Sequence, residues 1–383
     1  DEAHPGIAAS LHVLGCLMLA AGRHKEAEPL LELALEDREK LLGPDHPDTL
    51  SSLLDCAKLD HLMGRHEAAE PRMRKALDGR LRTLGEKHPD TLASMDGLGT
   101  VLKALARHDE AEDLLEQALE GREAVLGANH PDTLASMNNV GLLLKASGRF
   151  NEAEALFRRG LKRREELLGP THPDTLVFVN NLGMLLQSKG DLEQAETLIR
   201  AAMDRSQATL GAKHPDTLTT MNNFAMLLNQ MQKLEDAEKL LRSALKTSEA
   251  TIGPNHPNTL STVNNLGVLC QSSGSLEEAE LLYRRALEGR RVALGPVHPA
   301  TLNSLNNLAL LLQERGFHAE AKRLLFLAVE GCESSLGPDH PNTKLSKRNL
   351  KELAQAELRV PKALCTDDLG RPRMLDHKVE LLR

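Results

Sequence analysis

Residues 130–171 read HPDTLASMNNVGLLLKASGRFNEAEALFRRGLKRREELLGPT, and this stretch decides the fold. It holds two segments whose apolar residues recur at helical spacing, at residues 131–147 and at about 151–168. Gly148 separates the two segments and Gly169 closes the second. A glycine at these places suits a helix end in the left-handed conformation. The stretch therefore predicts a helical hairpin.

The hairpin recurs every 42 residues along the chain. The dipeptide His-Pro marks the start of each unit, usually within the string HPDTL, and its proline suits a first helical position, where a backbone N–H would have no partner. One hairpin cannot cover its own apolar face, so we expect the units to stack into an all-α solenoid. Eight units begin at His4, His46, His88, His130, His172, His214, His256 and His298, and a ninth, incomplete unit begins at His340.

Small residues occupy three fixed positions in each unit. In residues 130–171 they are Gly141, Ala153 and Gly160, and the large apolar Phe157 lies between them. Small side chains let helix axes approach to about 8 Å, the short end of the usual range, while a large partner fills the space around them. The pattern therefore predicts closely packed neighbouring helices.

This spacing of small residues resembles the tetratricopeptide repeat over nearly the whole chain. The 42-residue period and the HPDTL loop resemble the subclass found in kinesin light chains and nephrocystin-type proteins. The resemblance implies a right-handed superhelix of helix–turn–helix repeats whose first helices line a concave wall. It also implies a scaffold or adaptor that binds a protein or peptide partner.

The two ends of the repeat array differ. We expect residues 1–340 to form the superhelix, residues 341–358 a capping helix and residues 359–383 an extended basic tail. Lys347 and Lys351 replace apolar and small residues of the ninth unit, so a further helix cannot dock closely on it. The first helix has no comparable polar cap, which predicts that more protein precedes its start.

Composition excludes several classes of function. The 383 residues include six Phe, one Tyr and no Trp, too few aromatic side chains for a β-rich core. A net charge of −8 argues against a basic nucleic-acid-binding surface. No apolar run is long enough to span a membrane. The cysteines, which lack any C-x-x-C spacing, predict neither a disulfide framework nor a zinc knuckle and favour a reducing, cytoplasmic compartment; they are Cys16, Cys56, Cys270, Cys332 and Cys365.

Motifs for catalysis or for holding a cofactor are absent from the sequence. It has no phosphate loop, no H-E-x-x-H, no G-x-S-x-G and no Gly-rich dinucleotide turn, so we expect no enzyme and no cofactor. The periodic histidines do not predict a metal site either, because equivalent positions of stacked helices lie about 8–10 Å apart, whereas the ligands of one ion lie about 2 Å from it. We expect each His-Pro to set the start of a helix.

Pairs of asparagines lie beside the small residue of the first helix in units four to eight. Asn is a mediocre helix former, so ten of them inside helices need a reason. In the resembled family, the first Asn and the residues four and seven further on face the concave groove, and the second Asn commonly contacts peptide ligands. The resemblance therefore assigns to a peptide-binding strip Asn138, Asn139, Leu142, Lys145, Asn180, Asn181, Met184, Gln187, Asn222, Asn223, Met226, Asn229, Asn264, Asn265, Val268, Gln271, Asn306, Asn307, Leu310 and Gln313. An amide both donates and accepts, which suits an extended peptide backbone.

Other interpretations of the same residues stay open. The second asparagine of each pair could serve only to tie neighbouring helices together. The whole chain could be a structural subunit that braces a larger assembly through its loops, convex face or C-terminal tail, or a sensor arm of a longer protein. Motor-cargo adaptation rests on the resemblance alone, since the chain has no heptad coiled coil with which to join a motor.

Two further features lie in the second helices. Basic residues cluster at 158–164 and 284–291, interleaved with Glu, and we interpret them as solvated helix faces with i, i+4 ion pairs. Glycines fall inside these helices, where each costs up to about 1 kcal/mol; they are Gly79, Gly121, Gly289 and Gly331. Close approach of a partner would explain them.

Overall fold

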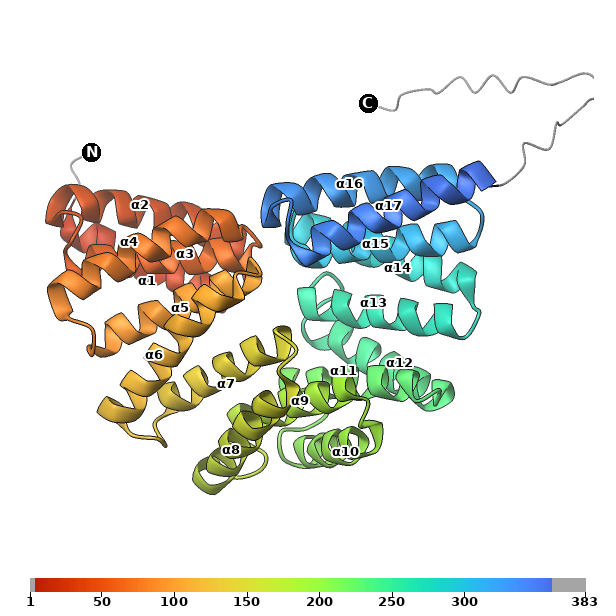
Figure 1. Ribbon diagram of the computed structural model, residues 1–383, viewed down its shortest axis with the longest axis horizontal. Helices are drawn as coiled ribbons and strands as arrows, with labels where there is room; N and C mark the ends of the chain where they lie inside the picture. Colours follow the sequence, from red (N-terminus) through yellow and green to blue (C-terminus); the bar gives the residue numbers. More distant parts are fainter. Residues whose placement is uncertain (1–3, 360–383) are drawn as a thin grey trace, which may run out of the picture.

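The secondary structure of the described residues consists of α-helices joined by short turns. The computed structural model describes residues 4–359, which form 17 α-helices and no strand. The helices are α1 (Pro5–Ala20), α2 (His24–Leu42), α3 (Pro47–Leu62), α4 (His66–Leu84), α5 (Pro89–Ala104), α6 (His108–Leu126), α7 (Pro131–Ala146), α8 (Phe150–Leu168), α9 (Pro173–Lys189), α10 (Leu192–Thr209), α11 (Pro215–Gln230), α12 (Leu234–Thr251), α13 (Pro257–Ser272), α14 (Leu276–Ala293), α15 (Pro299–Glu314), α16 (His318–Leu336) and α17 (Pro341–Arg359). They pair into eight hairpins followed by a single helix, which confirms the predicted all-α solenoid (Figure 1). None of the described helices is both long and apolar enough to cross a membrane.

Every odd-numbered helix starts at a His-Pro dipeptide. The histidine is the N-cap residue, and its Nδ1 accepts a hydrogen bond of 3.0–3.3 Å from the backbone N–H two residues further on. The proline that follows is the first residue of the helix. The bond satisfies one of the backbone donors that a helix start leaves unpaired. Because Nδ1 must accept, each ring caps its helix only while that nitrogen carries no proton.

The glycines that end the helices in residues 130–171 have positive φ angles. Gly148 has φ 76°, and Gly169 has φ 86° with ψ 166°. The second combination is not the left-handed helical conformation expected from the sequence, but an extended one that only glycine adopts readily. The prediction that these positions need glycine is therefore right, and the detailed conformation at Gly169 is different.

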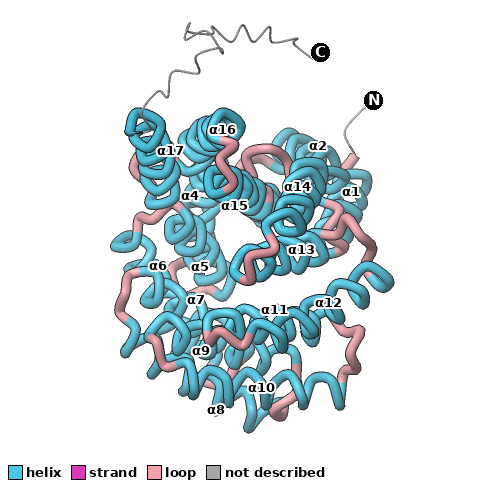
Figure 2. Tube along the Cα trace, turned by 90° about the vertical axis from the view of Figure 1, so that its right-hand side faces the viewer, coloured by secondary structure: helices cyan, strands magenta, loops and turns pink. Residues whose placement is uncertain are grey.

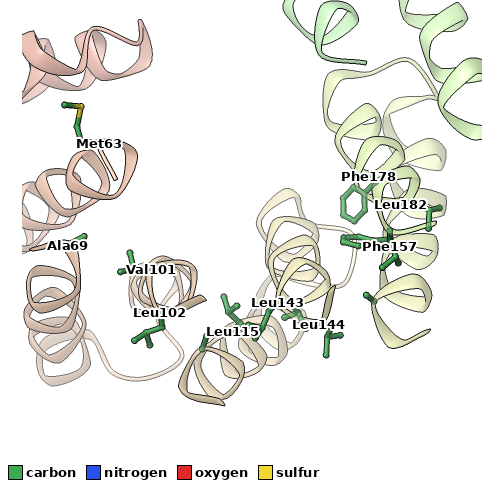
Figure 3. Packing of buried hydrophobic residues seen from close by; sticks show 14 of the residues in the cluster. Met63, Ala69, Val101, Leu102, Leu115, Leu143, Leu144, Phe157, Phe178 and Leu182 are labelled. Carbon is green, nitrogen blue, oxygen red and sulfur yellow. The ribbon is translucent and has the colours of Figure 1, made fainter. Parts of the chain in front are cut away.

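Large side chains pack against the small residues of the first helices. A Cβ atom built on Gly141 would lie 2.6 Å from Cε1 of Phe157, so no larger residue fits there. The Phe157 ring is fully buried and packs in a T-shaped arrangement with the Phe178 ring, with centroids 6.5 Å apart (Figure 3). This arrangement links α8 to α7 in the same hairpin and to α9 in the next, as the spacing of small residues predicts.

The glycines inside the second helices also have an intramolecular explanation. A Cβ atom on Gly121 would lie 2.5 Å from Cδ2 of Leu92, the last residue of the HPDTL string in the same unit. Gly79, Gly289 and Gly331 meet Leu50, Leu260 and Leu302 in the same way, at 2.6, 2.5 and 2.4 Å. The suggestion that a partner approaches these glycines is therefore wrong, because a leucine of the same hairpin fills the space.

This packing predicts opposite effects of the same substitution at two helical glycines. Gly97, in α5, has no atom closer than 3.5 Å to a built Cβ, so Gly97→Ala should stabilise the fold by about 0.5–1 kcal/mol through helix propensity. Gly121→Ala should instead destabilise it by about 1–2 kcal/mol, because forcing a methyl group into filled space outweighs that gain. Urea unfolding of both variants measures the two changes. Stabilisation by Gly121→Ala would contradict the packing argument.

One arginine position in the second helices is buried. Arg164 and Arg290 are each 6% exposed, so their interpretation as solvated residues is wrong. Arg290 Nη1 donates to the backbone oxygen of Ala300 at 3.1 Å and to Ser304 Oγ at 2.8 Å, both in the next repeat. Burial lowers the pKa of Arg290 to about 10. The equivalent arginines of the first three repeats are buried as well; they are Arg38, Arg80 and Arg122.

The other basic residues of the two clusters are solvated where the prediction places them. Arg158 pairs with Glu154 at 2.8 Å and Arg284 with Glu280 at 2.9 Å, each one helical turn apart, and both arginines are about half exposed. Exposed pairs of this kind contribute little to stability. The buried arginine differs from its neighbours because it binds residues at the start of the next odd-numbered helix, as Arg164 does with Asp174 and Arg290 with Ala300.

The stack bends round until its last helices lie against its first ones (Figures 1 and 2). His298 Nε2 lies 3.1 Å from the backbone oxygen of Leu62, and His340 Nε2 lies 3.0 Å from that of Ala104. Lys25 Nζ also reaches the backbone oxygen of Val292. We call this contact between α1–α5 and α14–α17 the seam. The two histidines thus cap their own helices with Nδ1 and bind a distant helix end with Nε2.

The final helix covers the end of the eighth repeat. It packs on α16 through buried Thr343, Ser346 and Leu353, while Lys347 and Lys351 are exposed. The helix extends from Pro341 to Arg359, close to the range that the sequence predicts for a capping helix. The predicted tail lies outside the described residues, apart from Arg359 itself.

Candidate peptide-binding surface

The odd-numbered helices form the inner layer of the bent stack. Successive odd helices contact one another, as α9, α11 and α13 do, whereas successive even helices are held apart by the odd helices between them. Because the inner side of a bend is the shorter one, the closer-spaced odd helices line the concave side. Figure 1 shows the same order, with α7, α9, α11 and α13 toward the centre and α6, α8 and α10 toward the periphery.

The strip that the sequence predicts keeps contact with solvent along its length. All its residues lie on α7, α9, α11, α13 and α15, and Asn264 is the only fully buried one, at 6% exposure. Met184 and Leu310 are the most open, with exposures of 41% and 37%. The residues therefore lie where a ligand could touch them, although most are only partly exposed.

Several asparagines of the strip bind one another across the boundary between repeats. Asn181 Nδ2 donates to Asn138 Oδ1 at 2.7 Å, and Asn307 Nδ2 donates to Asn264 Oδ1 at 3.4 Å. In both pairs the second asparagine of one repeat reaches the first asparagine of the preceding repeat. We call such a pair a rung. These two rungs tie neighbouring helices together, which was the alternative role considered for the second asparagine.

Two positions in the middle of the strip lack this bond. Asn180 and Asn222 donate to the hydroxyl groups of Thr220 and Thr262, at 3.3 and 2.8 Å. Among the described residues, Asn180 Oδ1 and Asn222 Oδ1 have no hydrogen-bond partner.

Asn223 and Asn265 stand where the rung partners of those two oxygens are expected. Within residues 4–359 their side-chain amides make no hydrogen bond, and both residues are partly exposed. Their donors and acceptors are therefore available to another molecule, whereas the Nδ2 donors of Asn181 and Asn307 are already used in the rungs.

The far edge of the strip is a row of amide side chains. Gln187 Nε2 donates to Gln230 Oε1 at 2.7 Å, and Gln271 Nε2 donates to Glu314 Oε2 at 2.8 Å. The hydroxyl group of Tyr283 donates to Gln271 Oε1 at 3.0 Å. Lys145 occupies the same row, and burial lowers its pKa. This edge is therefore polar, whereas Leu142, Met184, Met226, Val268 and Leu310 form an apolar row between it and the asparagines.

Protein-family models of the tetratricopeptide repeat match most of the chain, at residues 6–82, 60–124, 101–166, 174–250, 219–291 and 301–342. The chain belongs to the tetratricopeptide repeat family. Tetratricopeptide repeats form a family of non-catalytic scaffolds for protein partners, and an interaction scaffold is therefore the general function of this chain.

Solved structures of tetratricopeptide repeat proteins resemble the chain over part of its length. Two describe the nearly identical TPR-like repeats of a proposed kinesin light chain from Podosopora anserina, one of them with a single substitution. Each is 27% identical and covers 54% of this chain and 98% of its own, with TM-scores of 0.48 and 0.47. BtubC (BKLC) from P. vanneervenii is 24% identical and covers 62% of this chain and 92% of its own, with a TM-score of 0.45. No curated protein sequence matches the chain.

The rungs of this tetratricopeptide repeat chain extend beyond the predicted strip. Asn349, in α17, donates to Asn306 Oδ1 at 2.8 Å, and at the other end His12 and Asp55 are joined at 3.0 Å. Asp96 is the equivalent of Asn138 in the preceding repeat and faces Asn139. Burial raises the pKa of the Asp96 carboxyl group, although Asp96 also forms an ion pair with Arg122 at 2.9 Å. Sequence reasoning missed these pairs because it followed asparagine. The 42-residue period would have found them if any polar residue had been accepted at those positions.

A cavity of about 330 Å³ borders the C-terminal end of the strip. It is enclosed by α15, α16 and α17, and its lining includes Asn306, Leu302, Cys332 and Leu345. A larger cavity of about 530 Å³ lies between α14, α15 and α16 and is lined by residues such as Leu287, Leu305 and Leu327. Of these two cavities, only the first is lined by a residue of the predicted strip, Asn306.

Proposed function

We propose that the chain binds an extended peptide segment of a partner protein along the inner face of α11 and α13. The observation that carries the proposal is the pair of unbonded, partly exposed amides of Asn223 and Asn265. An amide that both donates and accepts can pair with a peptide backbone as a neighbouring strand does. Met226 and Val268 lie one helical turn further along the same helices, where they offer an apolar surface to ligand side chains.

The strength of binding must come from more than the amides. Each hydrogen bond adds about 0.5–1.5 kcal/mol net, whereas association costs on the order of 4–15 kcal/mol. Apolar side chains of the ligand must therefore fill the row that contains Met184, Met226 and Val268. The helices supply few aromatic residues there, so the bulky anchors belong to the ligand. Repeats about 10 Å apart match about three residues of an extended chain, so we expect an anchor at about every third residue.

The second candidate function is that of a structural subunit bound through its outer face. The observation that favours it is the apolar cavity of about 530 Å³ between α14, α15 and α16, together with Leu281, which is 71% exposed on α14. In that case a partner would cover the outer helices and leave the amides of the inner face free.

Peptides selected by display against the full chain provide the test. Asn223→Ala with Asn265→Ala should weaken binding of the selected peptides about 5- to 100-fold, the effect of losing two hydrogen bonds. The same double substitution should leave the thermal midpoint nearly unchanged, because neither amide bonds to the rest of the protein. Isothermal titration calorimetry and thermal unfolding measure the two effects.

Leu281→Glu is the matched control on the outer face. It should leave peptide affinity unchanged if the inner face binds. Loss of binding by Leu281→Glu, with unchanged binding by the double asparagine variant, would move the function to the outer face and overturn the proposal.

A further inference from the structure

Three side chains that can bind a metal ion meet at the N-terminal end of the inner face. His12 and Cys16 lie one helical turn apart on α1, and Asp55 lies on α3. His12 occupies the place of Asn138 in the repeat and Asp55 that of Asn181. This cluster is therefore a rung in which both amides are replaced by metal-binding groups, with a thiol added one turn further on.

The three ligand atoms already have the spacing of a tetrahedral site. His12 Nε2 lies 3.0 Å from Asp55 Oδ2, and Cys16 Sγ lies 3.8 Å from His12 Nε2 and 3.7 Å from Asp55 Oδ2. Ligand bonds to Zn²⁺ of about 2.0 Å for nitrogen and oxygen and about 2.3 Å for sulfur place neighbouring ligand atoms about 3.3–3.6 Å apart. Each observed distance therefore needs to change by only a few tenths of an ångström, which side-chain rotation can supply.

The surroundings orient the carboxylate and hold its charge. Lys58 Nζ binds Asp55 Oδ1 at 2.9 Å, which leaves Oδ2 directed at the other two ligands. Burial opposes the charge of Asp55, but hydrogen bonds from His12 and Lys58 outweigh it and lower the pKa of the carboxyl group to about 2. His12 and Asp55 are 16% and 19% exposed, so the cluster is shielded and still open to an ion from solvent.

We propose that His12, Cys16 and Asp55 form a Zn²⁺ site with three protein ligands and a fourth position occupied by water. Imidazole, thiolate and carboxylate are the ligands that zinc sites use, and borderline-soft zinc fits a mixed N, S and O set better than Mg²⁺ or Ca²⁺, which prefer oxygen ligands alone. The ion joins α1 to α3, so it replaces the amide rung of other repeats by a metal tie between repeats one and two.

Binding releases one proton per ion. A free thiol carries its proton at neutral pH, whereas zinc binds the thiolate, so the Cys16 sulfur must lose a proton when the ion binds. The S–H bond breaks as the S–Zn bond forms, and that proton goes to solvent. His12 gives up the Nε2 proton that it donates to Asp55 and takes a proton on Nδ1 instead, so that Nε2 can bind the ion. Lys58 and Arg38 favour the thiolate but repel the cation. The affinity for zinc should therefore rise with pH.

Cobalt provides the decisive measurement, because Co²⁺ occupies zinc sites and a cobalt–thiolate bond gives an intense near-ultraviolet charge-transfer band. The full chain, stripped of metal by a chelator, is titrated with Co²⁺ and then with Zn²⁺. We expect one equivalent of Co²⁺ to give the thiolate band and one equivalent of Zn²⁺ to remove it. Zinc should also raise the thermal midpoint of the protein.

Two variants isolate the cluster. His12→Asn with Asp55→Asn recreates the amide rung that Asn138 and Asn181 form, so the variant should fold, lose the band and lose the stabilisation by zinc. Cys270→Ser, which removes a different buried thiol, should keep both. His61 and His66 lie with their Nδ1 atoms 3.0 Å apart and could bind an ion without a thiolate. The test of the proposed site is therefore the thiolate band and not the number of ions bound. Absence of the band in the unmodified protein, or its persistence in the double asparagine variant, would overturn the proposal.

Discussion

Phe157→Ala should lower the free energy of unfolding by about 3–5 kcal/mol, the usual cost of removing a buried aromatic ring. The ring is fully buried, it fills the space beside Gly141, and it packs in a T-shaped arrangement with Phe178 of the next hairpin. Because each repeat contacts mainly its neighbours, the damage should be concentrated at the boundary between repeats four and five.

Phe326→Ala is the control for this prediction. Phe326 is 54% exposed on α16, so its removal should change stability by less than about 0.5 kcal/mol. Urea unfolding compares the two variants, and limited proteolysis should locate new cleavage of Phe157→Ala near Gly148 and Gly169. Equal effects of the two substitutions would show that burial at Phe157 does not determine stability.

Acidification from about pH 7.5 to about pH 5 should destabilise the protein and open the seam. Burial, helped by the nearby His61, His298 and His340, lowers the pKa of His66 from 6.5 to about 4. Burial likewise lowers the pKa values of His61, His298 and His340. These four histidines come from α3, α4 and the starts of α15 and α17, so the seam collects imidazoles from both ends of the stack.

The sign of the change in stability with pH follows from the protons bound by the folded and unfolded chains. The unfolded chain takes up protons as the pH falls through 6.5, whereas the folded chain resists protonation until about pH 4 at His66. Stability is therefore complete above pH 6.5 and decreases as the pH falls toward 4. One pKa unit corresponds to about 1.4 kcal/mol, so between about pH 6.5 and about pH 5 His66 alone accounts for a loss on the order of 2 kcal/mol. Other groups near the seam histidines oppose their protonation as well; they are Lys103 beside His61, Arg290 and His24 beside His298, and His108 beside His340.

Thermal unfolding and small-angle scattering at several pH values measure the loss of stability and the opening. His298→Asn with His340→Asn keeps the helix caps, since Asn is a good N-cap residue, but removes the hydrogen bonds to Leu62 and Ala104. This variant should be expanded already at neutral pH and should change less on acidification. His130→Asn with His172→Asn makes the same change at the caps of α7 and α9, in the middle of the stack. An equal loss of pH dependence in that control would assign the effect to the caps and not to the seam.

The hairpins could be predicted closely from the sequence because they depend on local rules. The predicted segments 131–147 and 151–168 correspond to Pro131–Ala146 and Phe150–Leu168. Helical periodicity, His-Pro starts and glycine ends all act within a few residues, and the period repeats them eight times. Pairs such as Gly141 and Phe157 were equally predictable, since both partners lie in one unit.

Features that join different repeats were less predictable. The cluster that contains Arg164 has the sequence of a solvated helix face, and nothing local shows that one member turns toward the start of the next helix. The seam depends on the rotations between successive repeats summed over most of the stack, which no pattern in a single unit encodes. The peptide-binding role of the strip stays a prediction from the family resemblance. The sequence also does not show that Asn181 binds Asn138 whereas Asn223 makes no hydrogen bond within the described residues, because both depend on contacts between neighbouring repeats. Asparagines at equivalent positions of different repeats therefore differ in their hydrogen bonds.

The seam has a mechanical consequence. Each of its two histidine bonds joins residues 236 apart, and the bonds themselves lie one 42-residue unit apart. The contact thus recurs with the period of the repeat, so equivalent positions of successive repeats touch across the seam. Compression along the axis of the superhelix is resisted by helices that are already in contact across the seam. Extension first breaks the imidazole hydrogen bonds and then changes the bend of the stack. The molecule should therefore be stiff under compression and yield in two stages under extension.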